Sequence, residues 1–520
     1  MFYDTLNAIT MEALRTNGLL PSWKDRLQFI ALGPRDLLLY LVCRTYRTFI
    51  LSFKFLPPRY LAWASGIRAR RAFFRAVREV PAYAKFLAGR GIENGYVPET
   101  DKESYIKVFS AESRCKGGCL PGIHVMIDES SGSTGVPFNW VRGREERNQT
   151  HEFISYFTRY GFGSGPWITV NAFSMGAWAT GINMGYALQM NSVVKNTGPD
   201  IAKILGTLTF FGSGYPYLIV GYPPFLKQLV DVAQRQGFPL ADFRLNAMVG
   251  GEGMSEGLRD YLLRVFQKVY SGYGASDLEI GIAGETPLSV AIRRRARDDA
   301  GVRDALFGGD SRLPMLFQYN PLMHYVETND KRELIFTITR SSILSPRIRY
   351  NIHDEGGVAR FDEMSGRLAG SGVDINTLAE PLPKPVIRLP FLWIYGRRDF
   401  TISVMGANIY PEDLEQAVYA DAELAGITRS FCQSLSEAPD GGVKPCFFFE
   451  VAVEPDDRLA RRFSDSILKH LLKINADFRE AWHEYPETMI PEIHLCRPGE
   501  GPFQQDAERI KQVRFLKFGA

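Results

Sequence analysis

The stretch that decides the fold of this 520-residue chain is Asp128-Glu129-Ser130-Ser131-Gly132-Ser133-Thr134-Gly135-Val136-Pro137. An apolar run at 125–127 leads into it as an expected strand, and residues 138–141 lead out as a second. Small residues leave backbone N–H groups and hydroxyls uncovered, which suits phosphate oxygens. It is not a Walker loop, because the lysine is missing and no helix follows. Taken alone, the stretch is also consistent with a flexible polar hairpin.

Downstream of this loop, short apolar runs alternate with helical patterns. Strands are expected at 167–170, 217–220 and 247–249, and a helix at 224–236. Continuous apolar strands with intervening helices are typical of parallel sheets covered on both faces. The sequence therefore predicts an α/β fold class, with a large body of mostly parallel sheets flanked by helices.

A smaller unit follows a boundary near residues 395–399. It contains an expected helix from Pro411, a strand at 446–453 and a helix at 458–473. These patterns predict a small α+β domain at 396–520.

Composition excludes several classes of protein. The chain has 61 basic and 58 acidic residues, a net charge of +3, so no general field for nucleic acid exists. With 45% hydrophobic residues it is not disordered as a whole. Six cysteines make no disulfide framework, and Cys115 and Cys119 lack a second pair at zinc-site spacing. The expected compartment is the cytoplasm.

The N-terminal part leaves two interpretations open. No signal peptide pattern is present, and charged residues interrupt the apolar run at 37–43 before it could span a membrane. Residues 35–63 either pack on the body or form an interfacial helix with peripheral membrane contact. In the second case the side chains in lipid would be Phe49, Ile50, Leu51, Phe53, Phe55 and Leu56. The double proline at 57–58 should end the helix.

Together with the loop, four further motifs in the same order carry a resemblance. They are Gly250-Gly251-Glu252, Tyr273-Gly274-Ala275-Ser276-Asp277, the segment 347–354 ending in His353-Asp354, and Gly396-Arg397-Arg398-Asp399 followed by 406–415. The chain resembles the adenylate-forming (acyl-CoA synthetase, or ANL) superfamily, specifically its phenylacetate–CoA ligase-like branch. The resemblance covers roughly residues 67–520. It implies a large N-terminal domain at 67–395 and a mobile C-terminal domain at 396–520, and leaves 1–66 as an unexplained helical extension.

The resemblance also implies site residues. Ser130, Ser131, Gly132, Ser133, Thr134 and Gly135 would hold ATP phosphates, with Thr134 counted among the catalytic residues. Asp277, in place of a glutamate, would position Mg²⁺, with Glu279 as an alternative ligand. Gly251, Glu252, Tyr273 and Gly274 would contact adenine, and Asp354 and Arg397 would hold the ribose or phosphate.

The C-terminal domain is expected to supply a catalytic lysine and a hinge. Arg509 to Arg514 keeps the family's lysine-to-arginine spacing but lacks its glycine, so Lys511 is the expected catalytic lysine and Lys517 the alternative. Asp399 lies at the expected hinge. Rotation about it would exchange the Lys511 face for one that admits a thiol.

The acyl pocket is expected in segment 171–181. It would be lined by Phe173, Met175 and Trp178, together with Gly251 and Ala275. The segment contains no cationic side chain, which favours an aromatic or apolar carboxylic acid. The alternative is that these side chains are simply core.

These observations predict an acid–thiol ligase. It would use ATP and Mg²⁺ to form an acyl-AMP and pass the acyl group to CoA or to a phosphopantetheine thiol on a carrier protein. Two alternatives remain: transfer to an amine, and a weakly active nucleotide-binding scaffold at a membrane. The arginines at 293–297 either meet CoA phosphates or an acidic carrier, or form a solvated helix face. The oligomeric state stays open, with a dimer as one alternative.

Overall fold

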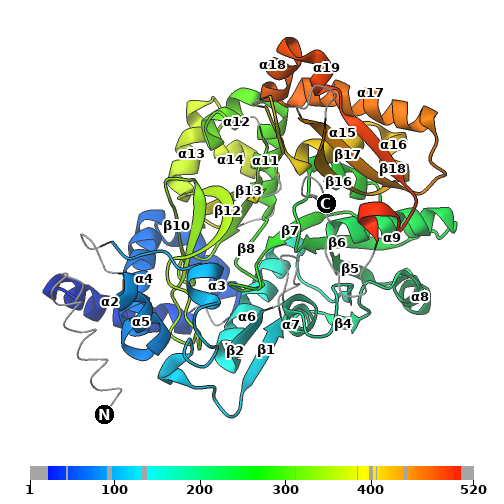
Figure 1. Ribbon diagram of the computed structural model, residues 1–520. Helices are drawn as coiled ribbons and strands as arrows, with labels where there is room; N and C mark the ends of the chain where they lie inside the picture. The colour runs from blue at the N-terminus through cyan, green and yellow to red at the C-terminus, as the bar shows by residue number, and fades with distance from the viewer. Residues whose placement is uncertain are drawn as a thin grey trace.

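The computed structural model describes residues 21–42, 45–90, 96–129, 138–310, 312–382, 385–397, 402–405, 407–437 and 443–504. The predicted phosphate loop Ser130–Gly135, the predicted hinge residue Asp399 and the two candidate lysines Lys511 and Lys517 lie outside these residues. The described part is a mixed α/β structure around an eleven-stranded sheet. Figure 1 shows its N-terminal helices at the lower left and its C-terminal elements at the upper right.

One half of the large sheet is parallel. Its strands lie in the order β7-β6-β5-β3-β4, and every neighbouring pair is parallel. The strands are β3 (Ile168–Asn171), β4 (Val193–Asn196), β5 (Pro216–Gly221), β6 (Arg244–Gly250) and β7 (Val269–Tyr273). The connecting helices are α7 (Ala179–Leu188), α8 (Ile201–Phe211), α9 (Pro223–Arg235), the short η3 (Leu240–Asp242) and α10 (Glu256–Leu262). The predicted α/β class is confirmed here.

The other half of the sheet is antiparallel, in the order β8-β9-β13-β12-β11-β10. Its strands are β8 (Ala283–Gly284), β9 (Met315–Tyr319), β10 (His324–Thr328), β11 (Glu333–Ile338), β12 (Tyr350–Ala359) and β13 (Phe391–Arg397). The associated helices are α11 (Pro287–Asp298), α12 (Ala300–Phe307), α13 (Phe361–Gly370) and α14 (Ile375–Ala379). The sequence pattern does not predict this half. Strands such as β9 are buried on both faces and therefore lack the alternation typical of antiparallel strands.

The predicted hairpin around the phosphate loop is present at its base. Strands β1 (Val125–Glu129) and β2 (Asn139–Gly143) pair antiparallel from Val125↔Gly143 to Glu129↔Asn139. Helix α6 (Arg144–Phe162) follows directly. Two short helices precede the hairpin, η1 (Lys102–Ile106) and η2 (Lys116–Gly118). The ends of β1 and β2 thus hold both ends of the predicted loop.

The N-terminal helices pack on the body of the protein. They are α2 (Trp23–Val42), α3 (Tyr46–Phe55), α4 (Pro58–Glu79) and α5 (Pro81–Arg90), with the break at 57–58 where the double proline predicts it. Phe49, Ile50 and Phe53 are buried in a cluster with Phe153 and Phe157 of α6. These three side chains are therefore unavailable to lipid, which corrects the interfacial interpretation, although Leu51 and Phe55 are exposed. Among the described helices, none has the length and apolar character needed to cross a membrane.

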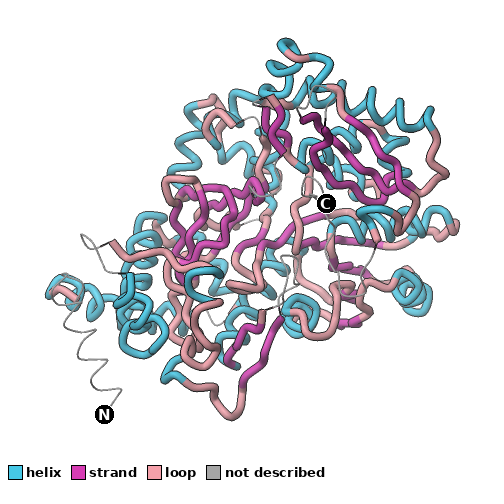
Figure 2. The backbone as a smooth tube through the Cα atoms, viewed as in Figure 1, coloured by secondary structure: helices cyan, strands magenta, loops and turns pink. Residues whose placement is uncertain are grey.

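The C-terminal elements enclose a hydrophobic cluster of their own, drawn from residues 402–489. They are β14 (Ile402–Val404), β15 (Ala407–Ile409), α15 (Pro411–Ala420), α16 (Ala422–Ile427), β16 (Thr428–Glu437), β17 (Val443–Val451), α17 (Asp457–Ile474), α18 (Ala476–Glu484), α19 (Pro486–Met489), β18 (Glu492–Cys496) and η5 (Gly501–Phe503). Figure 2 shows both strands and helices in this part, as the α+β pattern predicts. Hydrogen bonds tie it to the body, among them those from Lys227 Nζ to the Thr428 carbonyl (2.8 Å) and from the Ser255 N–H to Glu415 (2.9 Å).

Candidate functional site

The predicted adenine-binding residues follow two adjacent parallel strands. Gly251 and Glu252 follow β6, and Gly274 follows β7, with Gly250 opposite Gly272 in the ladder. Carboxyl ends of parallel strands meet at one edge of a sheet, where ligands of open α/β sheets bind. Gly251 has φ +83°, and a β-carbon there would lie 2.7 Å from the Tyr222 ring. Glycine is therefore needed at this turn for both conformation and space.

Tyr273 and Asp354 join two motifs that lie 81 residues apart in the sequence. The Tyr273 hydroxyl donates a hydrogen bond of 2.7 Å to Asp354 Oδ2. Burial and the adjacent Asp354 carboxylate raise the pKa of Tyr273 well above its ordinary value, so the hydroxyl keeps its proton. The Tyr273 ring lies beside Phe317 and Phe336, at centroid distances of 5.8 and 6.2 Å.

The backbone of Arg397 lies next to that of Asp354 in the sheet. It is the register partner of Asp354 on the neighbouring strand β13. The structure therefore brings together the predicted adenine residue Tyr273 and the two predicted ribose residues.

Asp277 lies in the turn after Tyr273 and is held by the segment that precedes Asp354. The Tyr350 hydroxyl donates to Asp277 Oδ2 at 3.0 Å, and Arg347 Nε donates to the Asp277 carbonyl at 2.8 Å. Burial, reinforced by the Asp277 carboxylate, raises the pKa of Tyr350 well above its ordinary value. Tyr350 is thus a neutral donor and brings no positive charge to the Asp277 carboxylate.

Arg142 connects this turn to the base of the phosphate loop. Its Nη2 donates to the Ser276 carbonyl at 2.6 Å, and its Nε lies 3.8 Å from Asp128 Oδ2. Asp128 also accepts a hydrogen bond from Asn183 at 3.3 Å. Burial raises the pKa of Asp128, while Arg142 opposes that rise. The predicted loop therefore starts beside the predicted metal-binding turn.

Glu279 is committed to a different network. Its carboxylate accepts from Arg340, from His324 Nε2 (2.7 Å) and from Thr150 (3.3 Å), and all four side chains are buried. Burial lowers the pKa of His324 to about 3, so the imidazole is neutral. A carboxylate already held by Arg340 fits a structural role better than the metal-ligand role considered as an alternative.

The predicted acyl segment lies beside the hairpin base and β5. The Glu129 N–H donates to the Ala177 carbonyl at 2.8 Å, and Glu129 pairs with Trp178 in an isolated bridge. Phe173 is buried and meets Tyr222 edge-on at 5.0 Å. Met175 and Trp178 are partly exposed, and Ala275 begins the turn that holds Asp277. Phe173, Tyr222 and Gly251 thus lie together and form one wall of the predicted acyl pocket.

The arginines of α11 are paired within the protein. Arg293 is buried and donates to Glu256 (2.8 Å) and to the Pro314 and Met254 carbonyls. Arg294 and Arg297 bind Asp260. Glu256 is buried, which by itself raises its pKa, but Arg259 and Arg293 hold that pKa at about 2. Arg293 is buried in this network, whereas Arg295 and Arg297 are exposed, as the solvated-face interpretation expects. Their acidic partners already occupy groups that were considered for CoA or carrier phosphates.

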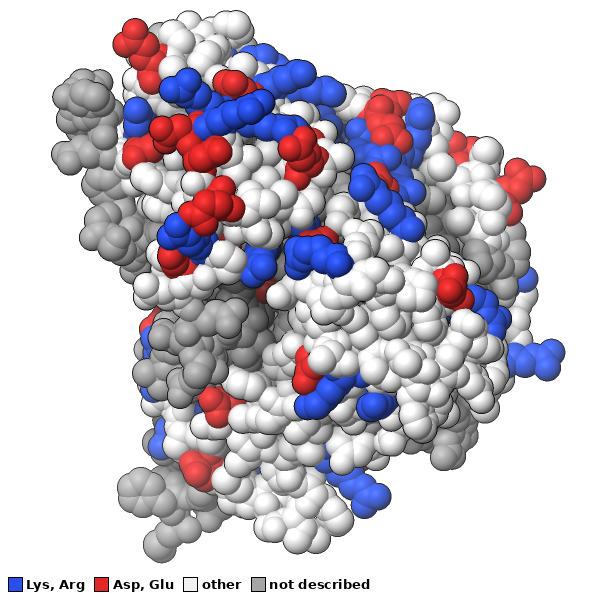
Figure 3. Space-filling model, turned by 90° about the vertical axis from the view of Figure 1, so that its right-hand side faces the viewer, with Lys and Arg blue, Asp and Glu red and all other residues white. Residues whose placement is uncertain are grey.

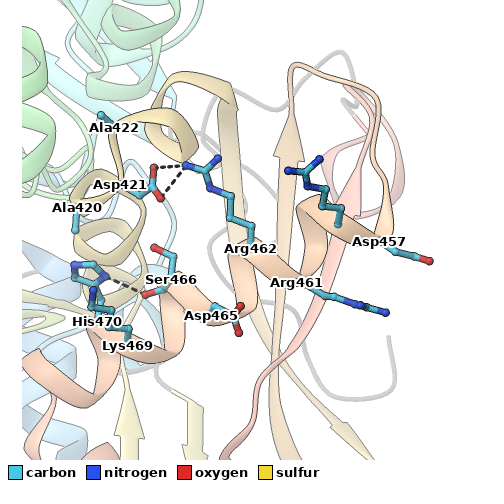
Figure 4. Close-up of a pocket in the computed structure, with 11 residues that line it drawn as sticks. Ala420, Asp421, Ala422, Asp457, Arg461, Arg462, Asp465, Ser466, Lys469 and His470 are labelled. Carbon is cyan, nitrogen blue, oxygen red and sulfur yellow. Dashed lines mark hydrogen bonds and ion pairs between the residues drawn. The ribbon is translucent and has the colours of Figure 1, made fainter.

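A surface cavity of about 900 Å³ lies elsewhere, between α16 and α17. Figure 4 shows Asp421, Arg462 and Lys469 on its wall. Figure 3 shows Lys and Arg side chains gathered over the upper part of one face of the molecule. None of the residues lining the cavity belongs to the predicted site.

Neither a protein-family model nor a curated protein sequence matches the chain. It is similar to solved structures of 2-hydroxyisobutyryl-CoA ligase. For that ligase in the postadenylation state, in complex with 2-HIB-AMP, the TM-score is 0.62 at 13% sequence identity, covering 88% of this chain and 89% of that chain. For the thioesterification state with 2-HIB-AMP and CoA, the TM-score is 0.51 at 14% identity, covering 90% and 92%. The chain has the fold of the adenylate-forming enzymes.

Within this adenylate-forming fold, sequence reasoning missed three residues that shape the candidate site. Arg142 and Tyr222 carry no motif signal, because their partners Ser276 and Gly251 are distant in sequence. Tyr222 follows directly after β5, and polar or aromatic residues after parallel strands are a usable signal. Tyr350 lies inside a motif that sequence reasoning did identify, but its contact with Asp277 depends on the fold.

Proposed function

We propose that this protein is an ATP-dependent acid–thiol ligase of the phenylacetate–CoA ligase-like type. In the first half-reaction a carboxylate attacks the α-phosphate of ATP, forming acyl-AMP and releasing pyrophosphate. In the second, a thiol attacks the acyl carbon and AMP leaves. The observation that carries the proposal is the Tyr273–Asp354 hydrogen bond, with Arg397 opposite Asp354 in the ladder.

Different residues have different roles in bringing the two anions, the carboxylate and ATP, together. Asp354 accepts from ribose hydroxyls, and Arg397 donates to ribose or phosphate. The phosphate loop, Ser130 to Gly135, supplies N–H groups and hydroxyls to the β- and γ-phosphates. Mg²⁺, when bound with ATP, would neutralise phosphate charge. Asp277 suits it, because Tyr350 donates to its carboxylate and Arg347 to its carbonyl, which orients an anionic oxygen donor in a fixed turn.

The acid is aromatic or apolar. Phe173 and Tyr222 present rings beside Gly251, and burial, reinforced by the nearby Glu252 carboxylate, raises the pKa of Tyr222 to about 12, so both rings are uncharged. A neutral wall of aromatic carbon favours an apolar acyl group over a second carboxylate.

The C-terminal part is proposed to rotate about Asp399 between the half-reactions. The TM-score is higher against the postadenylation state (0.62) than against the thioesterification state (0.51) of one ligase, which supports an arrangement closer to the former. Restricting the hinge by Asp399→Pro should leave pyrophosphate release largely intact and abolish thioester formation. Normal thioester formation in this variant would refute the hinge role.

The first half-reaction is tested by pyrophosphate release with a panel of aryl and fatty acids, without a thiol acceptor. Mass spectrometry of the same mixture should detect an acyl-adenylate of one acid class. A panel without pyrophosphate release and without adenylate would overturn the proposal and favour a nucleotide-binding scaffold. Once the acid is known, CoA, a phosphopantetheine-loaded carrier and an amine are compared as acceptors. Product formation with the amine alone would replace acid–thiol ligation by amide ligation.

A further inference from the structure

The two faces of the sheet β16-β17-β18 differ. One is apolar, and the other carries side chains that can bind a metal ion. Phe447, Phe449 and Val451 belong to the hydrophobic cluster of the C-terminal part. Side chains alternate between the faces of a strand, so Cys446 and Phe448 point to the opposite face. β18 is the edge strand of this sheet, and it pairs with β17 in parallel. Figure 1 shows the two strands side by side at the upper right.

Three different metal-binding groups meet on that opposite face. The Cys446 sulfur, a Glu492 carboxylate oxygen and a His494 ring nitrogen all lie within 4.8 Å of one another. Cys446 and Glu492 are direct register partners, and His494 is two residues after Glu492, on the same face. Two neighbouring strands therefore position all three donors without a loop.

The imidazole is oriented by its surroundings. The His494 ring stacks on Phe448, with centroids 4.7 Å apart and planes 15° from parallel. Its Nε2 lies 2.9 Å from Glu492 Oε1. The thiol of Cys446 is buried, whereas the Glu492 and His494 side chains are 40% and 43% exposed. The cluster is thus buried at its sulfur and open to solvent at its other two donors.

We propose that Cys446, Glu492 and His494 form a Zn²⁺ site, separate from the proposed nucleotide site. Thiolate and imidazole select a borderline-soft ion such as Zn²⁺ over Mg²⁺ or Ca²⁺. Zn²⁺ bonds of about 2.0–2.3 Å put ligand atoms about 3.3–3.8 Å apart. Shifts of about 1 Å in the side-chain positions would therefore bring all three donors into bonding distance of one ion. Three protein ligands leave a fourth position for water or an external ligand.

Two features set the properties of this site. Lys444 lies on the same strand face and interacts with Glu492, so its ammonium opposes a cation and limits the affinity. A bound Zn²⁺ fastens the edge strand β18 to β17. Binding to the folded state alone stabilises that state by mass action, so the metal should raise the melting temperature.

The experiment uses the full-length chain, stripped with a chelator and titrated with Co²⁺ and then Zn²⁺. One equivalent of Co²⁺ should give a thiolate-to-metal charge-transfer band, which Zn²⁺ removes. Cys446→Ser should abolish the band, and His494→Ala should weaken Zn²⁺ binding at least ~10-fold, a ligand loss being no milder than loss of an outer-shell partner. Two other cysteines serve as controls: Cys119, which is exposed and could bind the metal adventitiously, and Cys496, which lies on β18 near the proposed site. Cys119→Ser and Cys496→Ser should leave the charge-transfer band and the Zn²⁺ affinity unchanged.

Several results would overturn the site. They are the absence of a band in the unmodified chain, a band that survives Cys446→Ser or disappears in Cys119→Ser, and an unchanged affinity in His494→Ala. Melting temperatures give a second readout. Zn²⁺ should raise that of the unmodified chain and of Cys496→Ser, but not that of Cys446→Ser. None of these readouts requires the proposed ligase activity, so the two proposals fail independently.

Discussion

The Tyr350 hydroxyl donates a 3.0 Å hydrogen bond to Asp277 Oδ2, although 73 residues separate them in the sequence. Arg347, from the same segment, holds the Asp277 carbonyl. The turn after β7 is therefore fastened to β12, the strand that carries Asp354. The proposed metal-binding carboxylate and the proposed ribose-binding carboxylate thus lie on segments joined by hydrogen bonds, and this arrangement leads to separable predictions.

Asp277→Ala should lower the rate of acyl-adenylate formation by about 10²–10³-fold, because it removes the charge that positions the cation on ATP. Tyr350→Phe keeps the carboxylate and removes one neutral donor, so a loss of only about 10-fold is expected. Single-turnover pyrophosphate release at varied Mg²⁺ measures both. Equal losses in the two variants would contradict a metal-binding role for Asp277.

Tyr273→Phe should raise the KM for ATP about 10-fold with a small change in kcat. The substitution keeps the ring but removes a hydrogen bond to a carboxylate, and such bonds contribute about 1.5–3 kcal/mol. Steady-state pyrophosphate release with ATP as the varied substrate checks this. An unchanged KM would show that the hydrogen bond does not orient Asp354 for the ribose.

Lys511→Ala should slow acyl-adenylate formation by about 10²–10³-fold and spare thiol attack on a pre-made acyl-adenylate. The reason is that its ammonium is proposed to reach the reacting carboxylate and α-phosphate. Lys517→Ala is the matched variant and should retain both half-reactions. Equal loss in both half-reactions of Lys511→Ala would sink the assignment, and a loss confined to Lys517→Ala would transfer the role to that residue.

Asp413 gives a pH-dependent stability. Burial raises its pKa from 3.8 to about 6, and Asn475 and Tyr410 only partly oppose this by donating hydrogen bonds. The folded state binds the Asp413 proton more tightly than the unfolded state does. The stabilising contribution of this proton to the free energy of unfolding is therefore complete below about pH 4 and is lost as pH rises to about 6. The change corresponds to about 3 kcal/mol.

Asp413→Asn tests this, because the amide oxygen can accept both hydrogen bonds without ionising. Relative to the unmodified chain, the variant should gain up to about 3 kcal/mol of unfolding free energy between pH 4 and 7. Urea unfolding at several pH values measures the difference, with the exposed Asp465→Asn as the control. A difference that stays constant with pH would contradict the argument.

Arg259→Met should destabilise the fold by about 3–5 kcal/mol. Arg259 is buried and binds Glu256, Glu285 and the Val269 carbonyl, so its removal leaves two buried carboxylates with less compensation. Arg295→Met is the matched control, since Arg295 pairs with Asp299 at the surface, where such pairs contribute about 0–1 kcal/mol. Thermal unfolding distinguishes them, and similar melting temperatures would exclude a stabilising role for the buried network.

Part of the fold could be predicted because local patterns carry it. The runs that became β3, β5 and β6 are continuous and apolar, and helices follow them. The elements starting near Pro411, Cys446 and Arg458 were also predicted from their periodicity, and they are confirmed within a few residues. The antiparallel half was missed, because strands buried on both faces look the same whichever way their neighbours run.

The candidate site, too, could be predicted only in part from the sequence. Its motifs could be located from spacing, but its contacts could not. Glu279 and Asp277 are two residues apart and chemically alike, yet Arg340 and His324 bind one while Tyr350 binds the other. Those partners come from strands and loops tens of residues away, so only the folded arrangement separates the two carboxylates.

The ladder between β12 and β13 begins its pairing at Asp354 and Arg397, and Arg397 is the last residue of β13. None of the described strands that follow β13 belongs to the large sheet. If the C-terminal part rotates about Asp399 as proposed, the pivot lies two residues after Arg397, the partner of the proposed ribose residue Asp354 in the sheet. A nucleotide bound at this pair, as proposed, would lie directly beside the proposed hinge, so nucleotide binding and domain rotation would be coupled at neighbouring residues.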